Sequence, residues 1–265
     1  MLLAVHSGLD GRLASALGAL VAVAGLTACS HGATRAQLSP ASSSSASAAP
    51  TTLPDTTGAT RIRFARGTTS GILNDSLPAG GTKRYLLEAL QGQVMLAHAI
   101  AWPAPKSVQA PPETSVRVYD VTSGRELPAK GGPGPLWFGR LPSGGDYLVW
   151  VAVTVPTTYT LAVQIPRRVM VQGNQPATFS GVAPSRAPID YLIRGEAGRT
   201  LEVRLQGEDS ATHLHIYGLD DGVQLAHLAE QLRFYGGRLE TTQDYIVSVI
   251  PADPDAAYEV SITLK

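Results

Sequence analysis

The sequence predicts an all-β protein in which two tandem β-sandwich domains of the jelly-roll type follow a disordered tether. Apolar and polar residues alternate in short runs from Arg61 to the end of the chain, which is the pattern of half-buried strands. Turn signals that contain glycine separate these runs. The same tyrosines and glycines then occur a second time further along the chain. One fold is therefore expected to be built twice.

The repeat aligns residues 61–166 with residues 167–265, which are the two predicted domains. Its first part has an offset of 106 positions, as between Tyr85 and Tyr191. Its later part has an offset of 98 positions, as between Tyr147 and Tyr245. A feature present in both copies is expected to serve the fold, and a feature present in one copy is the better candidate for function.

The predicted strands are the runs in which the alternation is clearest. In the first copy they are residues 83–90, 94–100, 115–120, 146–153 and 159–165, and in the second copy 190–195, 200–205, 212–217, 244–250 and 258–264. Regular short strands with this spacing favour a sandwich. After the N-terminal apolar run, one short helical turn is expected, within residues 223–232.

Length and charge limit the classes of partner. A chain of 265 residues is long enough for two modest cores. Charged residues make up only 16% of the chain, and 21 basic residues balance 21 acidic ones. Since a nucleic-acid partner requires a concentrated basic surface, we expect no nucleic acid to bind.

The N-terminus has the features of a secretion signal followed by an anchor. Residues 1–28 are predicted to be a signal peptide, because an apolar run from residue 13 to 28 follows Arg12 and is short for a membrane-spanning helix. The run ends in Leu-Thr-Ala-Cys, which resembles the lipobox of bacterial lipoproteins. The resemblance implies cleavage before Cys29, the only cysteine, and a palmitate-type lipid modification that anchors the protein in the membrane.

The alternative for this segment is a plain signal peptide in which the cysteine occurs by chance. Ser30, rather than aspartate, follows the cysteine. In a bacterium with two membranes, the resemblance then implies sorting to the outer membrane, with the protein facing the periplasm. Residues 29–60 are rich in Ser, Ala, Thr and Pro and are predicted to be a disordered tether behind the lipidated cysteine, because they hold too few large apolar groups to fold.

The repeated tyrosine and glycine blocks resemble a known fold family. Residues 85–93 and 191–199 each begin with tyrosine and have glycine at the eighth position. They resemble the aromatic strand and glycine turn of bacterial pre-peptidase C-terminal domains. Residues 61–70 and 141–147 further resemble segments of the periplasmic inhibitors of g-type lysozyme, which share that sandwich. The resemblance implies a non-catalytic protein that blocks a lysozyme.

The chain departs from the inhibitor pattern at one place. In that family an arginine-rich segment follows the penultimate strand of the sandwich and contributes to lysozyme contact. The corresponding residues 153–159 contain no arginine, and their counterpart in the second copy, residues 250–255, is acidic.

The tryptophans are the clearest difference between the copies, since all three lie in the first. Trp102 and Lys106 belong to a proline-rich loop, which proline makes stiff. We expect either that this loop presents Trp102 to a partner as a recognition side chain, or that Trp102 folds back over the end of the sandwich as a lid. Trp137 is a further partner-binding candidate. Trp150 has Ser248 as its counterpart, so we expect it to cover an inter-domain contact or to form an exposed platform for a sugar or a protein.

Asp146 and Tyr147 recur as Asp244 and Tyr245. They are candidates for partner contact, but recurrence favours a structural role like that of the tyrosine corner of immunoglobulin-like folds.

No residues with the spacing of a catalytic or metal site stand out. His213 and His215 alternate with apolar neighbours and are expected to face solvent, and together with His227 they lack the spacing of a metal site. We therefore expect neither an enzyme nor a cofactor. The leading hypothesis is a non-catalytic envelope lipoprotein that blocks g-type lysozyme, and the alternative is an accessory envelope lipoprotein that binds peptidoglycan glycan or another envelope protein.

Overall fold

The computed structural model describes residues 54–102, 113–206, 212–227 and 230–265. These residues belong to one compact unit that spans residues 48–265. The predicted signal peptide, Cys29 and most of the predicted tether lie outside the described residues. Within the described ranges, the chain forms no helix with the length and apolar character that crossing a bilayer requires.

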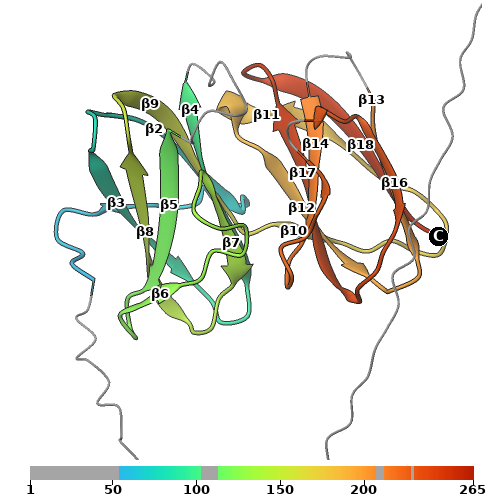
Figure 1. Cartoon of the computed structure of the whole chain (residues 1–265), viewed down its shortest axis with the longest axis horizontal. Coiled ribbons are helices and arrows are strands. Elements are labelled where there is room, and N and C mark those ends of the chain that lie inside the picture. Colours follow the sequence, from blue (N-terminus) through green and yellow to red (C-terminus); the bar gives the residue numbers. More distant parts are fainter. Residues whose placement is uncertain (1–53, 103–112, 207–211, 228–229) are drawn as a thin grey trace, which may run out of the picture. The chain divides into compact units, whose positions relative to one another are not determined.

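The first half of the described chain forms two facing sheets (Figure 1). Sheet I has the strand order β1-β3-β8-β5-β6 and sheet II the order β2-β9-β4-β7. The strands are β1 (Thr60–Arg61), β2 (Ser70–Leu77), β3 (Thr82–Ala89), β4 (Val94–Trp102), β5 (Thr114–Asp120), β6 (Arg125–Leu127), β7 (Leu136–Arg140), β8 (Gly145–Val153) and β9 (Thr157–Gln164). Within sheet I, only the β1–β3 pair is parallel.

The second half repeats this arrangement strand for strand. Sheet III has the order β10-β12-β17-β14-β15 and sheet IV the order β11-β18-β13-β16. The strands are β10 (Arg167–Val169), β11 (Ala177–Ala183), β12 (Ile189–Gly195), β13 (Thr200–Gln206), β14 (Thr212–Gly218), β15 (Gln224–Ala226), β16 (Phe234–Arg238), β17 (Gln243–Pro251) and β18 (Ala256–Leu264). A 3₁₀ turn, η1 (Pro184–Arg186), lies between β11 and β12.

The all-β prediction is confirmed, and the ten predicted strands coincide with strands of the structure within a few residues at each end. Of the helical turn expected within residues 223–232, the first part is wrong, because β15 occupies Gln224–Ala226 and pairs with β14. A short 3₁₀ turn does follow at Glu230, whose amide donates to the His227 carbonyl at 3.1 Å.

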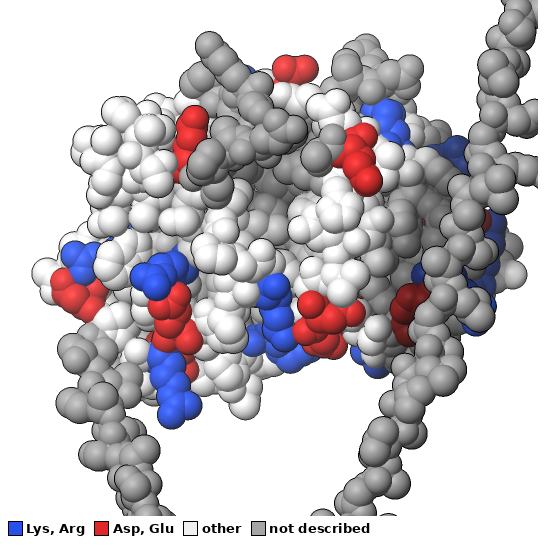
Figure 2. Space-filling model, in the orientation of Figure 1, with Lys and Arg blue, Asp and Glu red and all other residues white. Residues whose placement is uncertain are grey.

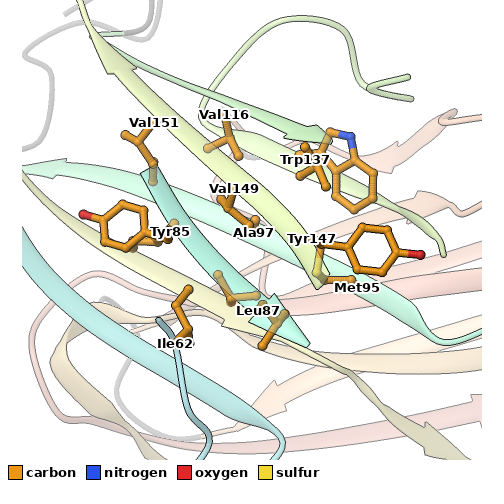
Figure 3. Packing of buried hydrophobic residues seen from close by; sticks show 14 of the residues in the cluster. Ile62, Tyr85, Leu87, Met95, Ala97, Val116, Trp137, Tyr147, Val149 and Val151 are labelled. Atoms are coloured by element: carbon orange, nitrogen blue, oxygen red, sulfur yellow. The ribbon is translucent and has the colours of Figure 1, made fainter. Parts of the chain in front are cut away.

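Each sandwich encloses its own apolar core. In the first, every second side chain of β3, β4 and β8 points inward, and Figure 3 shows how Tyr85, Leu87, Met95 and Val149 meet there. The core of the second sandwich uses the matching positions, such as Tyr191. Since the two cores share no residue, the tandem consists of two separately packed sandwiches.

The same tyrosine contacts occur within each of the two sandwiches. The hydroxyl oxygens of Tyr85 and Tyr159 are 2.6 Å apart across the first core, and those of Tyr191 and Tyr258 are 2.9 Å apart across the second. At the corner before β8, the Tyr147 hydroxyl donates to the carbonyl of Ser143 at 2.7 Å. The Tyr245 hydroxyl makes the same contact, with the carbonyl of Thr241 at 2.6 Å.

A third apolar cluster joins the two sandwiches, and we call it the joint. It combines outward-facing residues of sheet II with outward-facing residues of sheet III. Its members are Val94, Leu96 and Phe138 from the first sandwich and Leu192, Tyr217, Leu219 and Ile246 from the second. The Phe138 and Tyr217 rings are in contact, with their centroids 4.6 Å apart.

Polar contacts at the joint mostly run from a basic residue of the first sandwich to an acceptor of the second. His98 Nε2 lies 3.0 Å from Asp190 Oδ2, and Arg140 Nη2 donates to Asp244 Oδ2 at 2.9 Å. Lys130 Nζ donates to the Asp220 carbonyl at 2.7 Å. Because sheets II and III face each other, sheets I and IV lie at the two ends of the stack (Figure 1).

Candidate functional site

The outer face of sheet I carries a group of aromatic, aliphatic and arginine side chains, and we call it the open face. Residues that alternate with the core positions of β3, β5 and β8 form it. They are Arg84, Leu86, Arg117, Tyr119, Leu148 and Trp150. Leu148 is fully covered, while Leu86, Tyr119 and Trp150 are half-buried. The half-buried residues leave apolar surface available.

Trp150 occupies the centre of a row of three residues across this sheet. Arg84 on β3 and Arg117 on β5 are its direct neighbours in the strand register. The Tyr119 ring lies beside the indole, with 6.1 Å between the ring centroids. The row therefore places one indole between two guanidinium-bearing side chains, a geometry suited to contact with another molecule.

Both arginines of the row already have a carboxylate partner within the chain. Arg84 Nη1 pairs with Asp55, and this hydrogen bond lowers the pKa of the Asp55 carboxyl to about 2. Arg117 Nε donates to Glu126 Oε1 at 2.9 Å. In the view of Figure 2, basic and acidic side chains likewise lie next to one another over the lower part of the molecule.

A groove of about 610 Å³ opens beside Trp150. The two indoles of Trp137 and Trp150 line it, with hydroxyls of Thr82 and Ser115 and the Arg117–Glu126 pair among the polar groups. Its lining is mostly apolar. The groove thus places the Trp150 indole beside two hydroxyls and an ion pair.

The corresponding face of the second sandwich is covered. The repeat offsets place Asp190, Ser248 and His215 where the first sandwich has Arg84, Trp150 and Arg117. Asp190 is 3% exposed and Ser248 is 0% exposed, since sheet II packs on them. The open face of sheet I is therefore equivalent to the face of sheet III that packs on sheet II within this chain.

Among the predicted partner-binding residues, the groove brings Trp150 and Trp137 together. Trp150 is half-buried on the open face, away from the joint, so of the two roles expected for it only the platform agrees with its position. Trp137 points into the core, is 1% exposed, and donates from Nε1 to the Leu127 carbonyl at 3.2 Å. Of these two tryptophans, Trp150 is the one with part of its surface exposed.

Trp102 lies apart from the open face, at the end of β4 in sheet II. It is half-buried, and the guanidinium carbon of Arg186 from the second sandwich lies 3.5 Å from the centre of its ring. The Trp102 indole thus stacks on the neighbouring sandwich. Lys106 lies outside the described residues.

Asp146 and Tyr147 act in the same way in both copies. Asp146 accepts two hydrogen bonds from Arg61, at 3.0 and 2.7 Å, and Asp244 accepts two from Arg168, at 2.9 and 2.8 Å. Tyr147 is fully buried. The arginine–aspartate pair joins β1 to β8 and β10 to β17, which is a structural role.

The histidines of β14 were expected to face solvent, and this is wrong. His213 and His215 are half-buried, because the face of sheet III on which they lie is the one that packs on sheet II. Burial lowers the pKa of His215 to about 4. Among the described residues, no three His, Cys, Asp or Glu side chains gather as a metal site would require.

One buried cluster contains the residue types of a catalytic triad but has the wrong order. The Asp190 carboxylate lies between the other two residues, since Oδ2 meets His98 and Oδ1 accepts from the Ser248 hydroxyl at 2.5 Å. Activation of a serine requires the imidazole next to the hydroxyl. All three residues are also buried in the joint, so the cluster holds the sandwiches together.

Sequence reasoning identified Trp150 but missed its neighbours Arg84, Arg117 and Tyr119. The signal was present for the arginines, because the repeat exchanges Arg84 for Asp190 and Arg117 for His215. Finding it requires comparing every outward position of the two copies.

Comparisons with known proteins give limited likenesses. No protein-family model matches the chain, and no curated protein gives a significant match. The periplasmic inhibitor of g-type lysozyme from Aeromonas hydrophila is 23% identical over 40% of this chain and 94% of its own, with a TM-score of 0.33. The inhibitor from Salmonella Typhimurium is 21% identical over 37% of this chain and 98% of its own, with a TM-score of 0.29. The human CUB1-EGF-CUB2 fragment covers 74% of this chain and 100% of its own, at 8% identity and a TM-score of 0.26. Likenesses of this size say nothing about what the chain binds.

Proposed function

We propose that this protein is a non-catalytic lipoprotein of the cell envelope that binds a g-type lysozyme through the open face and blocks it. The observation that carries the proposal is the state of the two equivalent sheet faces. The face of sheet III is buried in the joint, whereas the open face of sheet I leaves Trp150 and its neighbours available.

The composition of the open face supports a protein partner. Tryptophan, tyrosine and arginine are the residues that most often contribute strongly to binding at protein interfaces. Trp150 and Tyr119 provide rigid aromatic surface, and Arg84 and Arg117 flank it. The identity of the partner rests on the sequence resemblance of residues 61–70 and 141–147 to the lysozyme inhibitors.

An inhibition assay tests the proposal. The chain from residue 30 onward, which lacks the predicted signal peptide and Cys29, is titrated into g-type lysozyme acting on bacterial cell walls. We expect inhibition at a near-stoichiometric ratio and at least a tenfold weaker effect for Trp150→Ala. Phe234→Ala is the matched control, because Phe234 is an exposed aromatic with its own arginine neighbour, at the other end of the stack. An equal effect of the two substitutions would exclude the open face as the inhibitory surface.

The second candidate is an accessory lipoprotein that holds peptidoglycan glycan in the groove. The groove volume of about 610 Å³ and the Trp150 indole beside the Thr82 and Ser115 hydroxyls favour this candidate. Co-sedimentation with purified sacculi distinguishes the two. Binding to sacculi that Trp150→Ala removes, without inhibition of lysozyme, would replace the first proposal by the second.

The anchor is tested separately. We propose that Cys29 carries the lipid and holds the protein at the outer membrane, facing the periplasm. The wild-type protein should then fractionate with outer membranes and show a mass that includes acyl chains. Cys29→Ser should be released in soluble form. Membrane association of Cys29→Ser that equals wild type would refute lipid anchoring.

A further inference from the structure

The joint shows what kind of surface a face of this type binds. On its sheet III side, Leu192, Ile246 and Tyr217 form the apolar centre, and Asp190 lies beside them. On its sheet II side, Leu96 and Phe138 pack on that centre, and His98 meets Asp190. An apolar surface with one polar side chain that contacts the carboxylate of the edge residue therefore covers this face.

The open face has the same apolar plan with a different charge. Leu86, Leu148 and Tyr119 take the positions of Leu192, Ile246 and Tyr217. The row that reads Asp190, Ser248 and His215 in sheet III reads Arg84, Trp150 and Arg117 in sheet I. The acidic end of the row has become basic, and tryptophan has replaced the small residue at its centre.

We propose that the open face docks an apolar protein surface that carries a carboxylate opposite Arg84, in the manner in which sheet III docks sheet II. The inference rests on the proposed function to the extent that both use the open face, and it adds the chemistry of the partner's contact surface. Asp55, whose side chain is 61% exposed, now pairs with Arg84. The carboxylate of the partner joins or replaces Asp55.

A second copy of this chain does not fit the requirement. Sheet IV is the counterpart of sheet II, and on it Thr200, Glu202 and Arg204 replace Val94, Leu96 and His98. Glu202 would meet the apolar centre of the open face, and Arg204 would meet Arg84. Glu202 is paired with Lys265, and Arg204 stacks on Phe234, so charged side chains hold the positions on sheet IV that Leu96 and His98 hold on sheet II.

The test converts sheet IV into the complementary surface and uses it as a probe. The probe chain carries Thr200→Val, Glu202→Leu and Arg204→Glu on β13, together with Trp150→Glu to block its own open face. Both the probe and the wild-type acceptor begin at residue 30. We expect a 1:1 complex in sedimentation velocity at micromolar concentrations, and no complex between two wild-type chains.

Charge exchange provides the control. Arg84→Glu in the acceptor should weaken binding of the probe at least tenfold. A second probe that retains Arg204 should reverse this preference and bind the Arg84→Glu acceptor more tightly than the wild type. Circular dichroism establishes that each probe is folded, and a probe with only Glu202→Leu, Arg204→Glu and Trp150→Glu serves if the larger set of substitutions disrupts β13.

Three results would overturn the inference: no complex with the wild-type acceptor, equal binding to a Trp150→Glu acceptor, or self-association of the wild-type chain. Failure here is distinct from failure of the proposed function. Probe binding without lysozyme inhibition would refute the lysozyme partner and retain the docking chemistry. Lysozyme inhibition that depends on Trp150, without probe binding, would refute the docking chemistry and retain the lysozyme partner.

Discussion

Arg140 of the first sandwich donates a hydrogen bond to Asp244 of the second at 2.9 Å, and the same carboxylate holds Arg168 with two further bonds. Its counterpart in the first sandwich, Asp146, accepts two hydrogen bonds from Arg61 and, among the described residues, forms no ion pair with the second sandwich. The side chain of Asp244 is 4% exposed and that of Asp146 is 34% exposed. The same element of the repeat has thus become part of the joint in only one copy.

This difference predicts unequal costs for the same substitution. Asp244→Asn removes the charged acceptor that two arginines share; because only the carboxylate is buried and the Arg140 and Arg168 side chains are 47% and 43% exposed, we expect a loss of about 2 kcal/mol in the free energy of unfolding. Asp146→Asn acts at a more exposed ion pair and should cost less than about 1 kcal/mol. Urea unfolding of both variants measures the difference. Equal losses would mean that the joint adds nothing to the Arg168–Asp244 pair.

The same carboxylate predicts how stability depends on pH. Hydrogen bonds from Arg168 and then from Arg140 lower the pKa of Asp244 in the folded protein. A lowered pKa contributes stability that is complete above the ordinary aspartate value of about 3.9 and is lost as pH falls through the folded pKa. The difference in melting temperature between the wild type and Asp244→Asn should be largest at neutral pH and should shrink below about pH 4. A constant difference down to pH 2 would contradict this assignment.

The central strands could be predicted from the sequence because their alternation reflects burial of one face. The strands that were missed lack that signal. In β2 the polar Asp75 lies between Leu73 and Leu77, the two leucines that pack against the core, so apolar and polar residues do not alternate there. In β16 two consecutive glycines, Gly236 and Gly237, interrupt the pattern, and the Phe234 ring covers Gly236.

The candidate site could be predicted only in part, because a sequence does not say which faces two sandwiches use for their contact. His215 alternates correctly with apolar residues, yet its face is the one that sheet II covers. Arg84 and Arg117 become neighbours of Trp150 only through the register of three strands that are far apart in the sequence. Trp150 was identifiable because Ser248 is so different in size.

The His98–Asp190 contact predicts strong coupling between the sandwiches. The Asp190 side chain is fully buried, so His98→Ala removes one of its two side-chain partners and should cost about 3 kcal/mol of unfolding free energy. Ser248→Ala removes the hydrogen bond that its hydroxyl donates to the same carboxylate and should cost about 1.5–3 kcal/mol. The double variant should lose less than the sum of the two single losses, since both partners contact one carboxylate.

Glu88→Ala, at an exposed position of β3, is the control and should change the free energy of unfolding by less than about 0.5 kcal/mol. Additive losses would show that the three groups do not form one network.

The two tryptophans of the groove predict opposite effects on stability and binding. Trp137 is 1% exposed in the core, and Trp137→Ala should cost about 3–5 kcal/mol of unfolding free energy through the cavity that it leaves. Trp150 is half-buried on the open face, and Trp150→Ala should cost less than about 1.5 kcal/mol while it weakens partner binding at least tenfold. Urea unfolding and the inhibition assay, applied to both variants, separate the two roles. Because truncation of either indole changes the same groove, a large loss of stability in Trp150→Ala with unchanged binding would show that this indole belongs to the packing of sheet I and that the partner contacts another surface.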